Sequence, residues 1–229
     1  MCGRYAAIAD AELLGEVFEI DEVAGPLPKP DYNVAPTDPV PAVMERERPE
    51  GRRRVLAEVR WGLVPSWSKD AAGAARLINA RVETVADKPA FRKAFASRRA
   101  LLPAAGYYEW YPVAGTKLKQ PYFIHRADGG LLAMAGLYEF WKAPDGTWLV
   151  TATVITTAAT DAVGHLHDRM PMIVPRENWA AWLDPGFGAD ARGLLSVPVP
   201  ELDFHPVSTA VNTVSNDGPE LIIPLASPS

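Results

Sequence analysis

The chain has 229 residues and a net charge of −5, and 48% of its residues are hydrophobic with a mean hydropathy of −0.05, which is typical of a packed soluble domain. One cysteine excludes an internal disulfide, no apolar run reaches the roughly 18 to 20 residues of a membrane helix, and acids within the first twenty residues argue against a secretory signal. These features predict one cytoplasmic domain over residues 1–229 with no membrane role.

The only cysteine, Cys2, directly follows Met1. If Met1 is removed, one residue carries both a free α-amine and a thiol, whose reference pKa values of about 7.7–8.0 and about 8.5 would let both groups react near neutral pH. An aldehyde can form an imine with the amine and then close onto the sulfur as a five-membered thiazolidine. The alternative is that Cys2 has no chemical role and lies at a frayed terminus.

Helix signals are few, and strand signals dominate the chain. Apolar residues at helical spacing predict short helices at residues 12–20, 88–97 and 176–183. β-Branched and aromatic residues between Gly, Pro and Asp punctuation predict strands at residues 40–44, 54–61, 100–103, 106–113, 121–125, 131–140, 148–157 and 172–174. The pattern predicts an α+β fold with a mainly antiparallel, barrel-like β core and a few short peripheral helices.

Two segments in the first third of the chain are candidates for ligand contacts. In Tyr-Asn-Val-Ala-Pro-Thr at residues 32–37, Asn33 could orient a substrate or act as a turn residue whose side chain bonds the backbone. Residues 61–67 are rich in Gly and Pro, so no regular strand is expected there. An exposed Trp67 ring in this segment could stack on a nucleobase.

The charge is distributed unevenly, although the net negative value by itself argues against nucleic acid. Residues 51–100 hold 12 Lys and Arg against 4 Asp and Glu, a local charge of +8, whereas the remainder holds 11 against 24, a local charge of −13. Two interpretations stay open. The run Arg52, Arg53 and Arg54 and the pair Arg98 and Arg99 could form a phosphate-binding face, or they could be a solvated turn and a helix end.

The segment Ile-Asn-Ala-Arg-Val-Glu-Thr at residues 78–84 groups polar side chains. If the segment is extended, Asn79, Arg81 and Glu83 share one face, because side chains alternate along a strand. That face is either solvated or lines a site.

A single carboxylate, Glu109, lies among four aromatic rings in Gly-Tyr-Tyr-Glu-Trp-Tyr at residues 106–111. Loss of water around it would raise its pKa towards neutrality, which suits a general acid. The competing interpretation is a carboxylate neutralised by a structural arginine.

Two of the four histidines lie in Gly-His-Leu-His-Asp-Arg-Met-Pro at residues 164–171. A zinc site would need further ligands, and the only thiol is at Cys2, so no metal is expected. A histidine beside Arg169 in this loop suits proton transfer near a phosphate or a developing oxyanion.

Together these motifs resemble the SOS-response-associated peptidase (SRAP) family, whose members are also described as abasic-site processing proteins. The resemblance covers nearly the whole chain and is carried by Met-Cys-Gly-Arg-Tyr at residues 1–5, Tyr-Asn-Val-Ala-Pro at 32–36, Trp-Gly-Leu-Val-Pro at 61–65, Ile-Asn-Ala-Arg-Val-Glu-Thr at 78–84, Gly-Tyr-Tyr-Glu-Trp at 106–110, His-Asp-Arg-Met-Pro at 167–171 and His-Pro-Val-Ser at 205–208, with Asn212 and Asn216. The resemblance implies the predicted barrel-like fold and a specific reaction at the N-terminal cysteine.

Members of the family trap the ring-opened aldehyde of an abasic site in single-stranded DNA as a thiazolidine on the N-terminal cysteine. The resemblance therefore implies single-stranded DNA with abasic sites as the partner, covalent crosslinking, weak lyase activity, crosslink reversal and removal of the chain's own Met1. It implies no cofactor, and a monomer is expected. The implied roles are nucleophile for Cys2, acid and base for Glu109, imine chemistry for His167, contact to the opened sugar for Asn79, phosphate contacts for Arg81, Arg169 and Arg4, and further DNA contacts for Asn33 and Trp67.

Two departures from relatives concern DNA contacts. Trp67 is followed by Ser68 where some relatives have a second tryptophan, and Ser215 stands where some have lysine. Two other hypotheses remain: a non-covalent reader of single strands or modified bases, which would not need Cys2, and an N-terminal-nucleophile amidohydrolase or peptidase, which would turn over small amides.

Overall fold

The computed structural model describes residues 2–195 and 200–226, which form two β-sheets with short helices around them. In the larger sheet the strands follow the order β12 (Arg169–Pro171), β11 (Trp148–Ala158), β10 (Leu132–Lys142), β7 (Arg99–Ala104), β4 (Pro39–Arg48), β5 (Gly51–Trp61) and β2 (Glu22–Ala24), and β6 (Asn79–Arg81) also pairs with β11. A parallel pairing of β5 with β11 closes β4, β5, β7, β10 and β11 into a ring. This ring is the barrel-like core that the sequence predicts.

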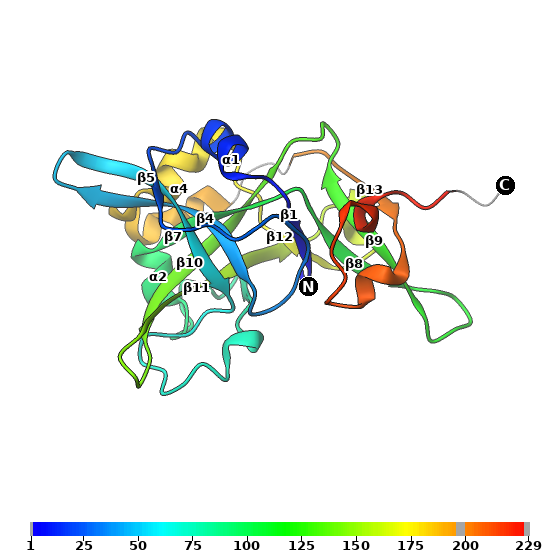
Figure 1. Cartoon of the computed structure of the whole chain (residues 1–229), viewed down its shortest axis with the longest axis horizontal. Helices are drawn as coiled ribbons and strands as arrows, with labels where there is room; N and C mark the ends of the chain where they lie inside the picture. Colours follow the sequence, from blue (N-terminus) through cyan, green and yellow to red (C-terminus); the bar gives the residue numbers. More distant parts are fainter. Residues whose placement is uncertain (1, 196–199, 227–229) are drawn as a thin grey trace.

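The smaller sheet is antiparallel, in the order β13 (Leu202–Pro206), β9 (Lys119–Arg126), β8 (Gly106–Pro112), β1 (Tyr5–Ala7) and β3 (Asp31–Val34). It lies beside the barrel, and the chain passes directly from β7 of the barrel into β8 of the smaller sheet (Figure 1). Gly106 begins β8 because a side chain would not fit: a Cβ there would lie 2.4 Å from the Phe123 ring and 2.5 Å from the Ile124 carbonyl oxygen. The absence of a side chain at this position lets β8, the strand that carries Glu109, lie close against β9.

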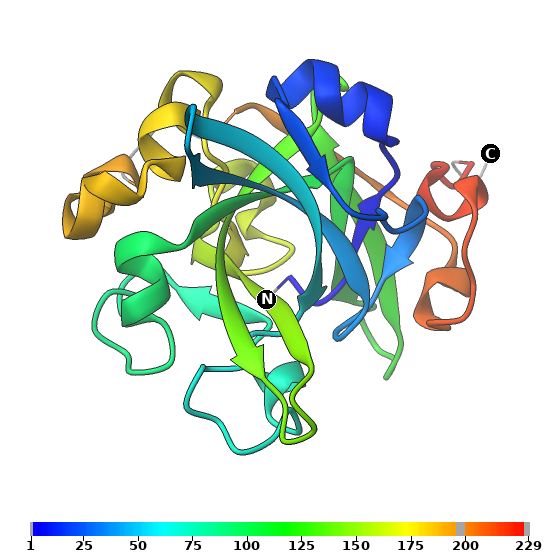
Figure 2. The same cartoon turned by 60° about the vertical axis from the view of Figure 1, so that its left-hand side comes forward.

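The α-helices are α1 (Ala11–Phe18), α2 (Arg92–Ser97), α3 (Asp161–Gly164) and α4 (Trp179–Leu183), and 3₁₀ turns include η4 (Thr209–Asn212) and η5 (Pro219–Ile222). The Asp10 side chain caps α1 by accepting from the Leu13 amide, and Glu19 ends the helix at φ 54°. Helices α1, α2 and α4 lie outside the barrel strands (Figures 1 and 2). None of the helices in the described residues is long and apolar enough to cross a membrane.

Alternation along the barrel strands divides the hydrophobic residues between two cores. On β5, Val55, Ala57 and Val59 belong to a core shared by the barrel interior and the smaller sheet, whereas Leu56 packs outside with helix residues such as Phe95 and Trp182. This is the period of two expected of strands with both faces buried. Cys2 belongs to the first core, between the two sheets.

The predicted fold class is confirmed, and the differences are local. Seven of the eight predicted strands are present, but at residues 172–174 only an isolated bridge from Ile173 to Met134 forms, because the strand there ends at Pro171. The helix predicted at 88–97 starts only at Arg92, after a series of turns, and the one predicted at 176–183 begins as a 3₁₀ turn. The sequence analysis missed the short strands β1, β2, β3 and β13, which owe their structure to pairing with distant strands.

Candidate functional site

Cys2 lies just before β1 with no solvent-exposed surface. The Asn79 amide Nδ2 donates to the Cys2 carbonyl oxygen at 2.7 Å, and the thiol Sγ lies 3.9 Å from the Arg4 carbonyl oxygen. Burial raises the pKa of the Cys2 thiol far above its usual range, and the nearby charge of Glu109 adds to the rise. The expectation of a thiol with a reference pKa near 8.5 is therefore wrong for the buried group, which stays protonated at neutral pH.

The amide that binds Cys2 is supplied by β6, which pairs in parallel with β11. Along β6, Asn79 is half-buried, Ala80 is buried and Arg81 is exposed. Asn79 and Arg81 share a side of the strand as the alternation predicts, but Glu83 lies beyond the strand in a turn. Asn79 therefore faces Cys2 while the Arg81 guanidinium is open to solvent.

Glu109 lies on β8 and is 5% exposed. Burial raises its pKa above the ordinary value, which confirms the direction predicted from its aromatic neighbours. Among the described side chains, the largest effect opposing this rise comes from His167. The described side chains that act on its pKa by charge are His167 and Asp168, neither of which is an arginine.

His167 follows α3 and has two contacts at the same ring nitrogen. The backbone N–H of Arg169 donates to Nδ1 at 2.9 Å, and the Asp168 carboxylate lies 2.9 Å from that same atom. A ring without a proton on Nδ1 accepts the amide bond, whereas a ring with a proton on Nδ1 donates to Asp168. Because Asp168 is largely exposed, the amide bond is the contact that orients the ring.

The Arg169 side chain is held in place by contacts within the chain. Its guanidinium makes two bonds to Glu83, at 2.5 and 3.0 Å, and a third to the Thr156 carbonyl oxygen at 2.6 Å. A phosphate that binds Arg169 would have to share it with Glu83 or displace Glu83.

Arg4 and Asn33 lie inside the molecule and bind each other. Arg4 Nη1 donates to Asn33 Oδ1 at 2.7 Å and to the Val211 carbonyl oxygen at 3.0 Å. Asn33 is 1% exposed, and its Nδ2 donates to the carbonyl oxygens of Val211, Thr213 and Asn216. In this structure Asn33 therefore bonds the backbone, as in the turn-residue interpretation, but it does so across 178 or more residues of sequence.

Trp67 is 68% exposed in a segment without regular strand structure, as expected. Two hollows flank it, one of about 140 Å³ and one of about 280 Å³. The smaller hollow is also lined by Arg92 and Lys93, which the sequence analysis did not single out. The signal that could have found them was two adjacent cations within the helix predicted at residues 88–97.

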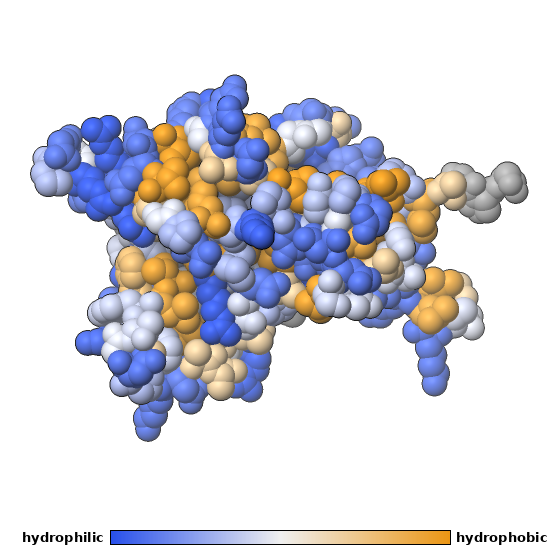
Figure 3. Space-filling view, in the orientation of Figure 1, coloured by the Kyte–Doolittle hydropathy of each residue, from blue (hydrophilic) through white to orange (hydrophobic). Residues whose placement is uncertain are grey.

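The arginine run at residues 52–54 does not form an open basic face. Arg52 pairs with Glu47 and Asp184, Arg53 lies 3.8 Å from Asp21, and Arg54 lies near Glu19 and Glu45. These residues belong to the projecting β4–β5 hairpin, whose surface is hydrophilic in Figure 3. Folding thus places acids from the rest of the chain against the locally basic segment.

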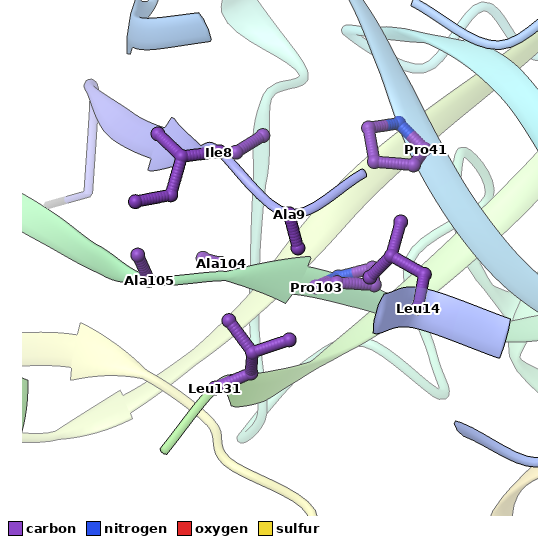
Figure 4. Close-up of a pocket in the computed structure, with 9 residues that line it drawn as sticks. Ile8, Ala9, Leu14, Pro41, Pro103, Ala104, Ala105 and Leu131 are labelled. Carbon is purple, nitrogen blue, oxygen red and sulfur yellow. The ribbon is translucent and has the colours of Figure 1, made fainter. Parts of the chain in front are cut away.

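A separate hollow near α1 has a different character. It has essentially no room for a water molecule, and all its lining residues are apolar, among them Leu14, Pro41, Pro103 and Leu131 (Figure 4). Over residues 2–195 and 200–226, no group of three or more His, Cys, Asp or Glu side chains is placed to hold a metal ion.

The fold and this site define a class: a β-barrel protein with an adjoining antiparallel sheet, in which a cysteine at position two is buried beside an amide and a carboxylate, and an imidazole acts on that carboxylate. Residues 1–214 match the SOS response associated peptidase (SRAP) family, and the chain belongs to that family.

Relatives extend along nearly the whole chain. The abasic site processing protein YoqW of Bacillus subtilis is 38% identical, over 97% of this chain and 99% of its own length. The mouse abasic site processing protein HMCES is 31% identical, over 98% of this chain and 76% of its own. A crystal structure of a protein from Bacteroides thetaiotaomicron has the same fold, with a TM-score of 0.84 over 98% of this chain and all of its own, at 22% identity.

Proposed function

We propose that this protein processes abasic sites in single-stranded DNA and becomes covalently linked to them through Cys2 after Met1 is removed. The family and the names of the 31–38% identical relatives support abasic-site processing. The observation that carries the finer proposal is the meeting of Cys2, Asn79 and Glu109, from three separate segments, in one buried place. His167 acts on the same carboxylate.

The proposed reaction uses the amine before the thiol. The freed α-amine of Cys2 adds to the aldehyde carbon of the ring-opened sugar, and the carbonyl oxygen leaves as water to give an imine. The sulfur then adds to the imine carbon and the thiol proton ends on nitrogen, so that an aldehyde and an aminothiol give a thiazolidine and water. Starting at the amine suits a site in which the thiol is protonated.

Glu109 and His167 supply the proton transfers in this proposal. A buried carboxyl with a raised pKa can donate to the departing oxygen and then accept from the thiol. His167 assists imine formation and crosslink reversal. The imine also allows weak strand cleavage by β-elimination. In this proposal the protein removes its own Met1.

In this proposal, exposed cations and aromatic rings make the contacts to DNA. Arg81 is the open guanidinium nearest to Asn79 along the chain, and Trp67 offers a ring on which a base can stack. Asn79 contacts the opened sugar, and Arg169 releases Glu83 to bind a phosphate. Arg4 and Asn33 support the strand that follows Cys2.

The decisive experiment mixes the purified protein with a single-stranded oligonucleotide that contains one abasic site and separates the products on a denaturing gel. The proposal expects a denaturant-resistant adduct, no adduct with intact DNA, and an N-terminal peptide whose mass lacks Met1. Cys2→Ala should abolish the adduct.

Other outcomes would favour the alternatives. Retention of DNA by Cys2→Ala with no adduct from the wild-type protein would indicate a non-covalent reader. Turnover of small amides without any adduct would indicate an amidohydrolase. An equally stable adduct from Cys2→Ser would contradict the thiazolidine.

A further inference from the structure

Two tyrosine hydroxyls lie buried beside Cys2 without a hydrogen-bond partner. Tyr5 and Tyr107 are both 0% exposed, and neither hydroxyl has a partner among the described residues. The Asn79 Oδ1 atom, on the amide that holds Cys2, is likewise buried and unpartnered. Unpaired buried polar groups destabilise a fold, so a cluster of them next to a reactive residue points to a ligand that pairs with them.

The strand register sets the direction of these groups. Tyr5 on β1 pairs with Tyr107 on β8, so the two side chains are cross-strand neighbours on one face of the smaller sheet. Glu109 is two residues after Tyr107 on β8 and therefore faces the same way. Cys2 belongs to the hydrophobic core on this face.

The surroundings distinguish Tyr107 from Tyr5. The titratable groups that act on Tyr107 are Cys2 and Glu109, whereas those that act on Tyr5 beyond Cys2 are Asp31 and Asp38. The Tyr5 ring also packs edge-on against Trp61, with centroids 4.9 Å apart. Burial raises the pKa of Tyr107 well above its usual range, so its hydroxyl keeps its proton and acts as a donor.

We propose that Tyr107 is a further catalytic residue, whose hydroxyl donates a hydrogen bond to the aldehyde oxygen of the ring-opened sugar held at Cys2. The inference rests on the function proposed above. When the amine adds to the aldehyde carbon, the electron pair of the C=O bond moves to this oxygen, and a donor already in place stabilises that charge. The oxygen then takes one proton from the amine nitrogen and a second from Glu109 and leaves as water, while Tyr107 keeps its own proton throughout.

The test compares Tyr107→Phe with Tyr108→Phe in single-turnover crosslinking to an abasic oligonucleotide. Tyr108 is the matched control, because it is the next residue on the same strand, is equally buried, and donates its hydroxyl to the Tyr32 carbonyl oxygen at 2.7 Å. Binding is measured in parallel with an oligonucleotide that carries a tetrahydrofuran site, which has no aldehyde.

For Tyr107→Phe we expect crosslinking slower by about 10²- to 10³-fold with tetrahydrofuran-DNA binding unchanged, because this is the usual effect on a rate of removing one oxyanion donor. Its thermal midpoint should equal or exceed that of the wild type, since the hydroxyl removed is unpaired. Tyr108→Phe should crosslink within about threefold of wild type and unfold at a lower temperature. A merely structural tyrosine cannot give this combination of lower rate and undiminished stability.

Wild-type crosslinking by Tyr107→Phe would overturn the inference and leave the proposed function intact. A wild-type protein that forms no adduct would overturn the proposed function itself. Tyr107→Met provides a second hydroxyl-free variant, and it too should fold, bind tetrahydrofuran-DNA and crosslink slowly.

Discussion

At the scale of single residues, Glu109 shows how burial changes the chemistry of an ordinary side chain. The carboxyl is 5% exposed on a strand between aromatic residues, and burial outweighs the opposing effect of His167 on its pKa. A carboxyl with a raised pKa favours its protonated form in the folded state. Ionisation at neutral pH therefore weakens the fold while preparing the group for proton transfer.

Glu109→Gln should lower the crosslinking rate by about 100-fold, within the usual contribution of a general acid or base. The same substitution should raise the free energy of unfolding at pH 7, because the ionised carboxylate is destabilised by burial. The difference should shrink as pH falls and vanish below the ordinary value of 4.5, where both folded and unfolded wild type are protonated.

Urea denaturation at pH 7 and at pH 4 measures the stability difference, and a denaturing gel time course measures the rate. Glu177→Gln, at an exposed position, is the control and should change neither quantity. A Glu109→Gln protein less stable than wild type at pH 7 would contradict this account.

Arg81→Ala should weaken binding to tetrahydrofuran-containing single-stranded DNA and make its salt dependence shallower. Loss of one phosphate contact on a single strand should reduce the slope of log K against log salt by about 0.7. Arg126→Ala is the matched control, because Arg126 is already paired with Asp128 at 2.5 Å. An unchanged slope for Arg81→Ala, measured by fluorescence anisotropy, would remove Arg81 from the DNA contacts.

At the scale of elements, short helices are secured against the barrel by one buried arginine. Arg99 begins β7, is 2% exposed, and donates to the carbonyl oxygens of Phe95, Ala96, Trp182, Asp184 and Gly188. These carbonyls lie at or near the ends of α2 and α4, where backbone oxygens lack partners within the helix. Arg99 is thus a structural cation. It follows a helix end, as one of the two interpretations of its sequence position expects, but its side chain is buried.

Arg99→Met should lower the free energy of unfolding by about 3 kcal/mol, because several buried carbonyl oxygens lose their donor. Urea denaturation of this variant beside Arg92→Met measures the loss. Arg92 lies on α2 but is exposed, so its substitution should change stability by about 0.5 kcal/mol or less. Equal losses for the two variants would show that Arg99 does not secure the helix ends.

At the scale of the whole molecule, the site depends on the meeting of two sheets and on a tie between the two ends of the chain. Cys2 packs between the barrel interior and the smaller sheet, which the chain enters directly from β7. Asn33 on β3 binds the segment around η4 through three carbonyl oxygens and binds Arg4 through its own oxygen. The C-terminal segment thereby supports the strand that follows Cys2.

Asn33→Ala should lower the free energy of unfolding by about 2–3 kcal/mol and loosen the C-terminal segment first. Hydrogen exchange should show faster exchange of the amides at residues 209–222, with barrel amides at 55–59 little affected. Asn216→Ala removes an amide from the same segment at an exposed position and should have a smaller effect. Uniformly faster exchange across the chain would indicate a global rather than a local role.

The sequence alone determined the fold class, seven of the eight long-strand positions and the polar motifs, because alternation, turn residues and buried aromatic runs are local properties. It also predicted the direction of the Glu109 pKa shift but not its cause, because the adjacent rings Tyr108 and Trp110 pack on the opposite face of β8 and the burial comes from the tertiary structure. Only the tertiary structure decided which groups meet: Asn79 at the Cys2 carbonyl, acids against the arginine run, Asn33 turned inward, and the Tyr107 hydroxyl beside Cys2. The physical reason is that desolvation and hydrogen-bond satisfaction depend on residues distant in the chain, which pair only when the two sheets close on each other.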